Sequence, residues 1–206
     1  MQKIIIFLFK IFKRLKAITF TPLDKISTII IFYGNGVKFA NFQTNGIPKV
    51  NINLKGKCRI GPNFRMNNSE MSNPIGRFNR CSIIVGEKGH LIIGSNVGMS
   101  STAIVCHNVI KIGDNVNIGG NVVIYDTDFH SLTPSHRLDG NLDRKNTETK
   151  EVIICDSVFI GAHSTILKGV TIGENSIIGA CSLVSKNIPS NEIWGGNPAR
   201  FLKKII

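Results

Sequence analysis

The sequence predicts an all-β domain in which short strands wind into a three-sided prism. The first observation is a hexad repeat in which every sixth residue is aliphatic, at Ile112, Ile118 and Ile124 and again at Ile154, Ile160, Ile166, Ile172, Ile178 and Val184. The second is that a glycine often follows the aliphatic residue, as at Gly113 and Gly161. The third is the composition, because 206 residues with 42% hydrophobic and 18% charged side chains suit one globular domain.

A period of six fits neither an amphipathic helix nor a simple alternating strand. It suits a chain that turns a corner every six residues. Three such sides, about eighteen residues in all, close a triangular coil, and successive coils stack at roughly 4.8 Å. One aliphatic residue from each side then points into the prism, and Gly or Asn serves corners that need a positive φ. A sandwich with coincidental spacing is the alternative, and six consecutive aliphatic residues in register argue against it.

Residues 1–20 form a basic, apolar segment that precedes the repeat. It has no acid, and its bases are Lys3, Lys10, Lys13, Arg14 and Lys16. The uninterrupted apolar run ends at Lys10, well short of the about 20 residues that a membrane-spanning helix needs, and no small-residue cleavage site follows it. We expect an amphipathic helix that either lies in the membrane interface or packs on its own domain or on a neighbouring subunit.

The remaining segments follow from the extent of the repeat. Residues 21–49 are expected to cap the amino-terminal end, residues 50–190 to form the β-helix, and residues 191–206 to close the other end with a short helix. The hexads stop after Ile124 and resume at Ile154, which predicts a protruding polar loop over residues 131–151. Long loops between regular elements commonly carry function.

Charge and residue spacing limit the partners and cofactors. Lys plus Arg is 25 and Asp plus Glu is 13, and the net charge of +12 favours an anionic partner such as a phosphorylated ligand or a membrane surface. Nucleic acid is not expected, because no binding motif for it is visible and aromatic residues are only 7%. The five cysteines and five histidines lack metal-ligand spacing, which predicts no metal, no disulfide framework and a cytoplasmic chain.

The segment 158–186, VFIGAHSTILKGVTIGENSIIGACSLVSK, followed by NIPSNEIWGGNPAR, resembles the hexapeptide-repeat acyltransferases. The resemblance covers residues 50–203 and is strongest to the sugar O-acetyltransferases, such as the maltose and galactoside acetyltransferases. It implies a left-handed parallel β-helix, a handedness that breaks the usual crossover rule and that spacing alone does not predict. It also implies acetyl-CoA as the acyl donor and a homotrimer with its active sites between neighbouring prisms.

Within this resemblance, His130 in the stretch DTDFHS takes the place of the family's catalytic histidine. An imidazole can remove the proton of an acceptor hydroxyl at neutral pH, and that oxygen then attacks the acetyl thioester directly. Backbone N–H groups are expected to stabilise the oxyanion. Asp128 is expected to orient the ring, with Asp126 as the lower-ranked carboxylate, although either can instead cap backbone N–H groups.

The resemblance places coenzyme A along the last coils. Its binding residues are expected to be small ones that allow close approach and polar or basic ones for the phosphates: Ala162, Ala180, Ser185, Lys186, Arg200 and Lys203. On the acceptor side, the sugar acetyltransferases carry an Asn on the coil before the catalytic histidine, where this chain has Met99. The residues expected to contact the acceptor are Ser100, Ser101, His107 and Arg137.

These observations predict an acetyl-CoA-dependent O-acetyltransferase that modifies a sugar hydroxyl in surface polysaccharide or lipopolysaccharide assembly. The acceptor is free or lipid-linked, and the basic segment 1–20 favours a peripheral position at the inner face of the cytoplasmic membrane. Two alternatives stay open: acetylation of an amino sugar or another small acceptor, and a non-catalytic β-helix that binds a polyanion. His130 and its loop favour the enzyme, because a binding scaffold needs neither.

Overall fold

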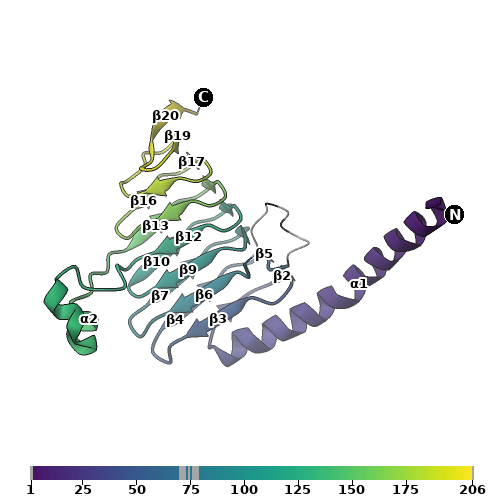
Figure 1. Cartoon of the computed structure of the whole chain (residues 1–206), viewed down its shortest axis with the longest axis horizontal. Coiled ribbons are helices and arrows are strands. Elements are labelled where there is room, and N and C mark those ends of the chain that lie inside the picture. Colours follow the sequence, from purple (N-terminus) through teal and green to yellow (C-terminus); the bar gives the residue numbers. More distant parts are fainter. Residues whose placement is uncertain (1, 70–72, 74, 76–78, 206) are drawn as a thin grey trace.

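The computed structural model describes residues 2–69, 73, 75 and 79–205 of the chain. Its strands form a column of stacked coils, with the long helix α1 (Gln2–Gly34) at the base and the short helix α2 (Gly140–Asn146) projecting from the side (Figure 1). Successive coils each add a strand to three sheets, and the coils wind as a left-handed parallel β-helix. The predicted fold class is confirmed.

The three sheets are the faces of the column, named here A, B and C. Face A contains β1 (Lys38–Phe39), β4 (Lys57–Ile60), β7 (His90–Ile93), β10 (Val109–Ile112), β13 (Val152–Ile154) and β16 (Thr171–Ile172). Face B contains β2 (Phe42–Asn45), β5 (Phe64–Asn67), β8 (Gly98–Ser100), β11 (Asn117–Ile118), β14 (Phe159–Ile160), β17 (Ile177–Ile178), β19 (Glu192–Gly195) and β20 (Arg200–Lys204). Face C contains β3 (Lys49–Ile52), β6 (Ser82–Val85), β9 (Ala103–Cys106), β12 (Val123–Tyr125), β15 (Thr165–Ile166) and β18 (Leu183–Val184).

Aliphatic residues of the hexad fill the interior of the column. Parallel pairing keeps them in register, as where Ile112 lies opposite Ile154 and Ile124 lies opposite Ile166. The hexad residues over 112–124 and 154–184 are each at most 4% exposed. Burial of such a side chain contributes about 1.5–3 kcal/mol, so the stacked interior supplies the stability that strands of two residues cannot supply alone.

Residues with a left-handed backbone turn the chain from one face to the next. At the corner between faces A and B these include Asn63, Asn96, Asn115 and Asn175, with φ between 59° and 60°. Their side chains also bond along the column, since Asn63 Nδ2 donates to Asn96 Oδ1 at 2.9 Å and Asn96 Nδ2 donates to Asn115 Oδ1 at 3.0 Å. Asparagine tolerates this conformation because its short side chain bonds locally, and the asparagines therefore serve the corners as expected.

The base of the column is closed by the last third of α1. The helix runs past residue 20 to Gly34 and so includes residues that we expected in the cap. Phe32 is fully buried, and its ring centroid lies 5.2 Å from those of Phe39 and Phe42. Among the described residues, no helix is long and apolar enough to cross a membrane.

The opposite end of the column differs from the prediction. The expected short carboxy-terminal helix is wrong, because β20 returns antiparallel to β19 and extends face B. The two strands are joined through a Gly-Gly-Asn-Pro stretch, and glycine and proline favour a turn over a helix. The rings of Trp194 and Phe201 then pack edge to face at 6.3 Å.

The loop after β12 leaves the column at the corner between faces C and A. It is folded, because it contains the 3-10 helix η2 (Pro134–Leu138) as well as α2. Asp139 caps α2 by accepting the backbone N–H groups of Asn141 and Leu142. The two ends of the loop are joined where Thr127 bridges Thr149. The loop is therefore a structured arm, and Figure 1 shows α2 standing clear of the column.

Candidate active site

His130 lies at the base of this arm, directly after a strained residue. Phe129 has a left-handed backbone with φ of 64°, and its N–H donates to Thr127 Oγ1 at 3.1 Å. A bulky residue in this conformation costs free energy and is frequent at functional sites. The His130 side chain is 70% exposed, so a substrate can reach its imidazole from solvent.

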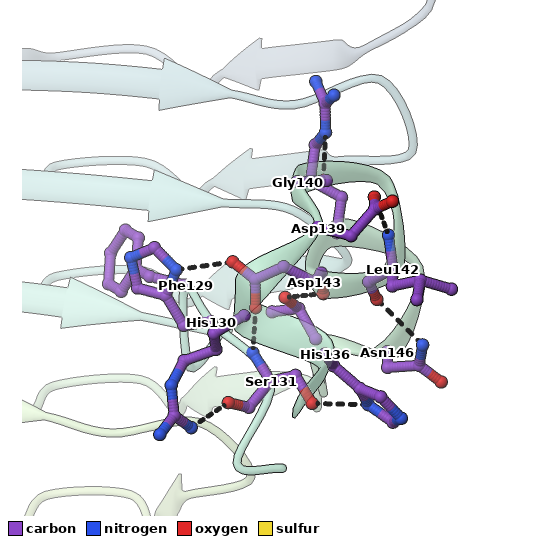
Figure 2. Close-up of polar contacts among 12 residues, drawn as sticks. Phe129, His130, Ser131, His136, Asp139, Gly140, Leu142, Asp143 and Asn146 are labelled. Atoms are coloured by element: carbon purple, nitrogen blue, oxygen red, sulfur yellow. Dashed lines mark hydrogen bonds and ion pairs between the residues drawn. The ribbon is translucent and has the colours of Figure 1, made fainter. Parts of the chain in front are cut away.

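Asp143 of α2 holds the imidazole of His130 (Figure 2). Its Oδ2 lies 2.7 Å from His130 Nδ1, and its Oδ1 accepts the backbone N–H of Ser131 at 2.7 Å. The hydrogen bond from His130, followed by that from Ser131, lowers the pKa of the Asp143 carboxyl. A carboxylate that accepts Nδ1–H leaves the lone pair on Nε2, and this is the state that a general base requires.

Asp128, which we expected to orient His130, is bound elsewhere. Its Oδ2 lies 3.3 Å from Lys168 Nζ, and Lys168 also donates to Glu148 at 3.1 Å. The expected contact between Asp128 and His130 is therefore wrong. Lys168 binds the Asp128 carboxylate, and Asp143 contacts the imidazole ring. Sequence reasoning missed Asp143, although the N-cap signal at Asp139 could have predicted the helix that carries it.

Asp126 supports the corner beneath the loop. It is fully buried, and its two carboxylate oxygens accept the backbone N–H groups of His107 and Asn108, each at 2.7 Å. Both oxygens are thus engaged by the backbone of the preceding coil. Asp126 fixes the position of His107 relative to the start of the loop, and its carboxylate does not serve the imidazole.

Two of the four residues expected to contact the acceptor lie near His130. His107 is exposed, and its ring centroid lies 6.4 Å from that of Phe129, which in turn lies 5.0 Å from that of Tyr125. Arg137 donates from Nη1 to the backbone oxygen of Ser131 at 2.7 Å. The exposed corner therefore combines one imidazole base with an aromatic wall and a guanidinium.

Ser100 and Ser101 lie away from this corner. Ser100 ends β8 on face B and accepts a hydrogen bond from Asn67 Nδ2 at 3.0 Å. Ser101 is buried at the corner between faces B and C and accepts one from Asn73 Nδ2 at 3.0 Å. Within one chain, face C separates both serines from His130.

The residues expected to bind coenzyme A are distributed over two corners and the last strand. Ala162 and Ala180 follow β14 and β17 at the corner between faces B and C, and Ala180 is exposed. Ser185 and Lys186 follow β18 at the corner between faces C and A, and both are exposed.

Arg200 and Lys203 are exposed on β20. No acidic side chain pairs with Lys186, Arg200 or Lys203 in the part of the chain that the structure describes. These exposed bases fit the phosphates of coenzyme A, and the small corner residues fit close approach of its amide arm. In the described ranges, no group of three His, Cys, Asp or Glu side chains could hold a metal ion.

Comparison with known proteins identifies the repeat. Residues 151–186 match the family described as "Bacterial transferase hexapeptide (six repeats)", and residues 109–124 match "Hexapeptide repeat of succinyl-transferase". The galactoside O-acetyltransferase of Escherichia coli (strain K12) is 39% identical over 115 residues, which are 54% of this chain and 56% of that protein. The chain spans about half the length of the curated relatives it matches.

Solved structures extend the likeness over most of the column. A mutant of AntD, an N-acyltransferase from Bacillus cereus in complex with dTDP and coenzyme A, has a TM-score of 0.64 and 25% identity, over 86% of this chain and 88% of that one. A maltose O-acetyltransferase from Clostridium difficile 630 has a TM-score of 0.52 and 26% identity, over 85% of this chain and 73% of that one. The resemblance to hexapeptide-repeat acyltransferases is confirmed.

Proposed function

Because the chain is a hexapeptide-repeat protein similar to sugar O-acetyltransferases, we propose that it transfers an acetyl group from acetyl-CoA to a sugar hydroxyl. The observation that carries this proposal is the exposed imidazole of His130, held through Nδ1 by Asp143 at 2.7 Å. A scaffold that only binds a polyanion has no use for such a pair.

The pair supports a direct transfer. His130 Nε2 takes the proton of the acceptor hydroxyl as the oxygen attacks the thioester carbonyl carbon. The new C–O bond forms, the C–S bond breaks, and the imidazolium returns its proton to the coenzyme A thiolate. Asp143 acts through the ring, because it keeps Nδ1 protonated and stabilises the positive charge on the imidazolium.

The coenzyme would be held by residues of the last coils. Lys186, Arg200 and Lys203 supply positive charge for its phosphates, while Ala162 and Ala180 leave the backbone at their corner accessible. These alanines and His130 lie on opposite sides of face C in one chain. That separation supports a homotrimer in which His130 of one subunit faces the alanine corner of the next.

The acceptor would lie against the exposed corner. His107, Phe129 and Tyr125 form an aromatic wall beside the base, and Arg137 adds a donor for oxygen-rich ligands. These features suit a carbohydrate, and we place the reaction in the assembly of surface polysaccharide or lipopolysaccharide. The likeness to the N-acyltransferase AntD supports a second candidate, transfer to the amine of an amino sugar by the same base.

Release of coenzyme A thiol measures the reaction. Purified protein is given acetyl-CoA and a panel of free sugars, amino sugars, nucleotide sugars and lipid-linked oligosaccharides. We expect release with at least one carbohydrate acceptor and a product ester that mild base cleaves, whereas a base-stable amide would indicate the amino-sugar candidate. Binding of acetyl-CoA without release for any member of the panel would contradict the proposal.

A further inference from the structure

The outward face of α1 carries an unusual row of exposed apolar side chains. Seven of them lie between 54% and 66% exposed: Ile4, Ile5, Leu8, Phe12, Leu23, Ile26 and Ile30. At 3.6 residues per turn these positions fall within a sector of about 100°, so they form one line along the helix, here called the apolar stripe. With a rise of about 1.5 Å per residue, the stripe is about 39 Å long.

The opposite side of the helix fixes the direction in which the stripe faces. Thr28 and Phe32 are fully buried, and the Asp24 carboxylate accepts the backbone N–H of Gly46 at 2.8 Å. This contact attaches the last third of α1 to the base of the column and turns the stripe outward. The amino-terminal part of the helix continues past the edge of the column (Figure 1).

The charge of the helix indicates what covers the stripe. Lys3 and Lys10 are exposed and lie about seven residues apart, on the side of the helix away from the stripe. The sequence adds Lys13, Arg14 and Lys16, whose side chains lie outside the described part, and the one acid of residues 2–34, Asp24, is directed to the column. These bases give α1 an excess of positive charge, which an anionic bilayer neutralises.

We propose that α1 lies flat on an anionic membrane, with the apolar stripe below the headgroups and its bases among them. Long lysine side chains can reach the headgroups while their stems stay with the apolar face. The face reaches well beyond residues 1–20, as far as Ile30 at the base of the column. The membrane therefore also sets the orientation of the column. Membrane binding through the apolar stripe does not depend on the proposed acyl transfer.

Sedimentation with lipid vesicles tests the surface on the full-length protein. The vesicles contain phosphatidylcholine alone or a mixture of phosphatidylcholine and phosphatidylglycerol. We expect partition into the anionic vesicles, a fall of at least about tenfold for the double variant Ile26→Glu and Ile30→Glu, and about fivefold for each of Lys3→Gln and Lys10→Gln. Both isoleucines are exposed, so unchanged thermal unfolding of the variants serves as the check on folding.

The matched control is Leu202→Glu, at a site 60% exposed on β20 at the other end of the column, and its partition should equal that of the wild type. Equal partition of the wild type and the isoleucine double variant, or no partition of the wild type, would overturn the proposal. A double variant that loses its oligomeric state in light scattering, where the wild type ignores vesicles, would assign the stripe to a second copy instead. Thiol release is measured separately, so failure here leaves the proposed reaction standing.

Discussion

Substitution of Asp143 by Asn isolates the contact that prepares His130. The carboxylate accepts two donors, His130 Nδ1 and the Ser131 N–H, each at 2.7 Å, but an amide has a single acceptor oxygen. Its NH2 group must oppose one of the two donors, so either the ring or the backbone beside it loses its partner. The charge that stabilises the imidazolium is lost in both cases.

The expected loss of turnover is intermediate. Loss of a general base costs about 10²- to 10⁴-fold, and Asp143→Asn keeps the base while removing its orientation. The imidazole is 70% exposed, so water partly replaces the missing partner. We therefore expect kcat to fall by about 10- to 10²-fold, with the KM for acetyl-CoA unchanged because Asp143 lies outside the coenzyme residues.

Asp139→Asn is the matched control, because it makes the same chemical change four residues earlier. The Asp139 carboxylate accepts only the backbone N–H groups of Asn141 and Leu142 in the described contacts, and Asn is an equally good N-cap. Thiol release with a series of acetyl-CoA concentrations should give wild-type kcat for this variant. Equal losses in the two variants, or wild-type kcat for Asp143→Asn, would refute the positioning role.

Further predictions concern stability, pH and thiol chemistry. Asp126→Asn should lower the free energy of unfolding in urea by about 1–3 kcal/mol, because the fully buried side chain then lacks an acceptor for one of the two backbone N–H groups that it binds. An unchanged midpoint would contradict this. The pKa of Asp143 is lowered in the folded protein. Its contribution to loop stability is therefore complete above the unfolded-state pKa of about 3.9 and is lost as the pH falls through the folded-state value. Hydrogen exchange should show protection of α2 at about pH 7 and loss of protection in acid, and equal protection at both would count against the contact between Asp143 and His130. Burial raises the pKa of the Cys58 and Cys106 thiols to about 12 and that of Cys81 to about 11. A disulfide reagent should therefore react quickly with exposed Cys181 and with these three thiols only on unfolding. Rapid reaction of the three in the folded protein would contradict their burial.

The sequence predicted the column because its information is local and repeated. Each aliphatic residue of the hexad, such as Ile154 or Ile160, sits in register with a copy above and below, so errors at one position do not change the pattern. The helix α1 extends well past the predicted segment 1–20, and Leu23, Ile26 and Ile30 already show the helical spacing that continues it. The hairpin of β19 and β20 has a local signal in the Gly-Gly-Asn-Pro stretch that joins the two strands, and the expectation of a helix overlooked it.

The candidate site could be proposed from the sequence where a motif marks it, but not where it depends on tertiary contacts. His130 follows from the stretch DTDFHS, and its place at the base of the arm agrees with the break in the hexads. Asp128 was chosen for its closeness in sequence, but Lys168, forty residues later, takes its carboxylate. Asp143 reaches the His130 ring only because α2 folds back on the loop. Neither residue spacing nor residue type predicts that contact.

The central claim is that His130 is the base of an acyl transfer, and turnover of His130→Ala tests it most directly. The reference variant is His90→Gln, which removes an exposed imidazole on β7, and each is assayed by thiol release with the acceptor on which the wild type is active. We predict a loss of about 10²- to 10⁴-fold for His130→Ala, wild-type turnover for His90→Gln, and unchanged thermal unfolding of both. Wild-type turnover by His130→Ala would contradict the account.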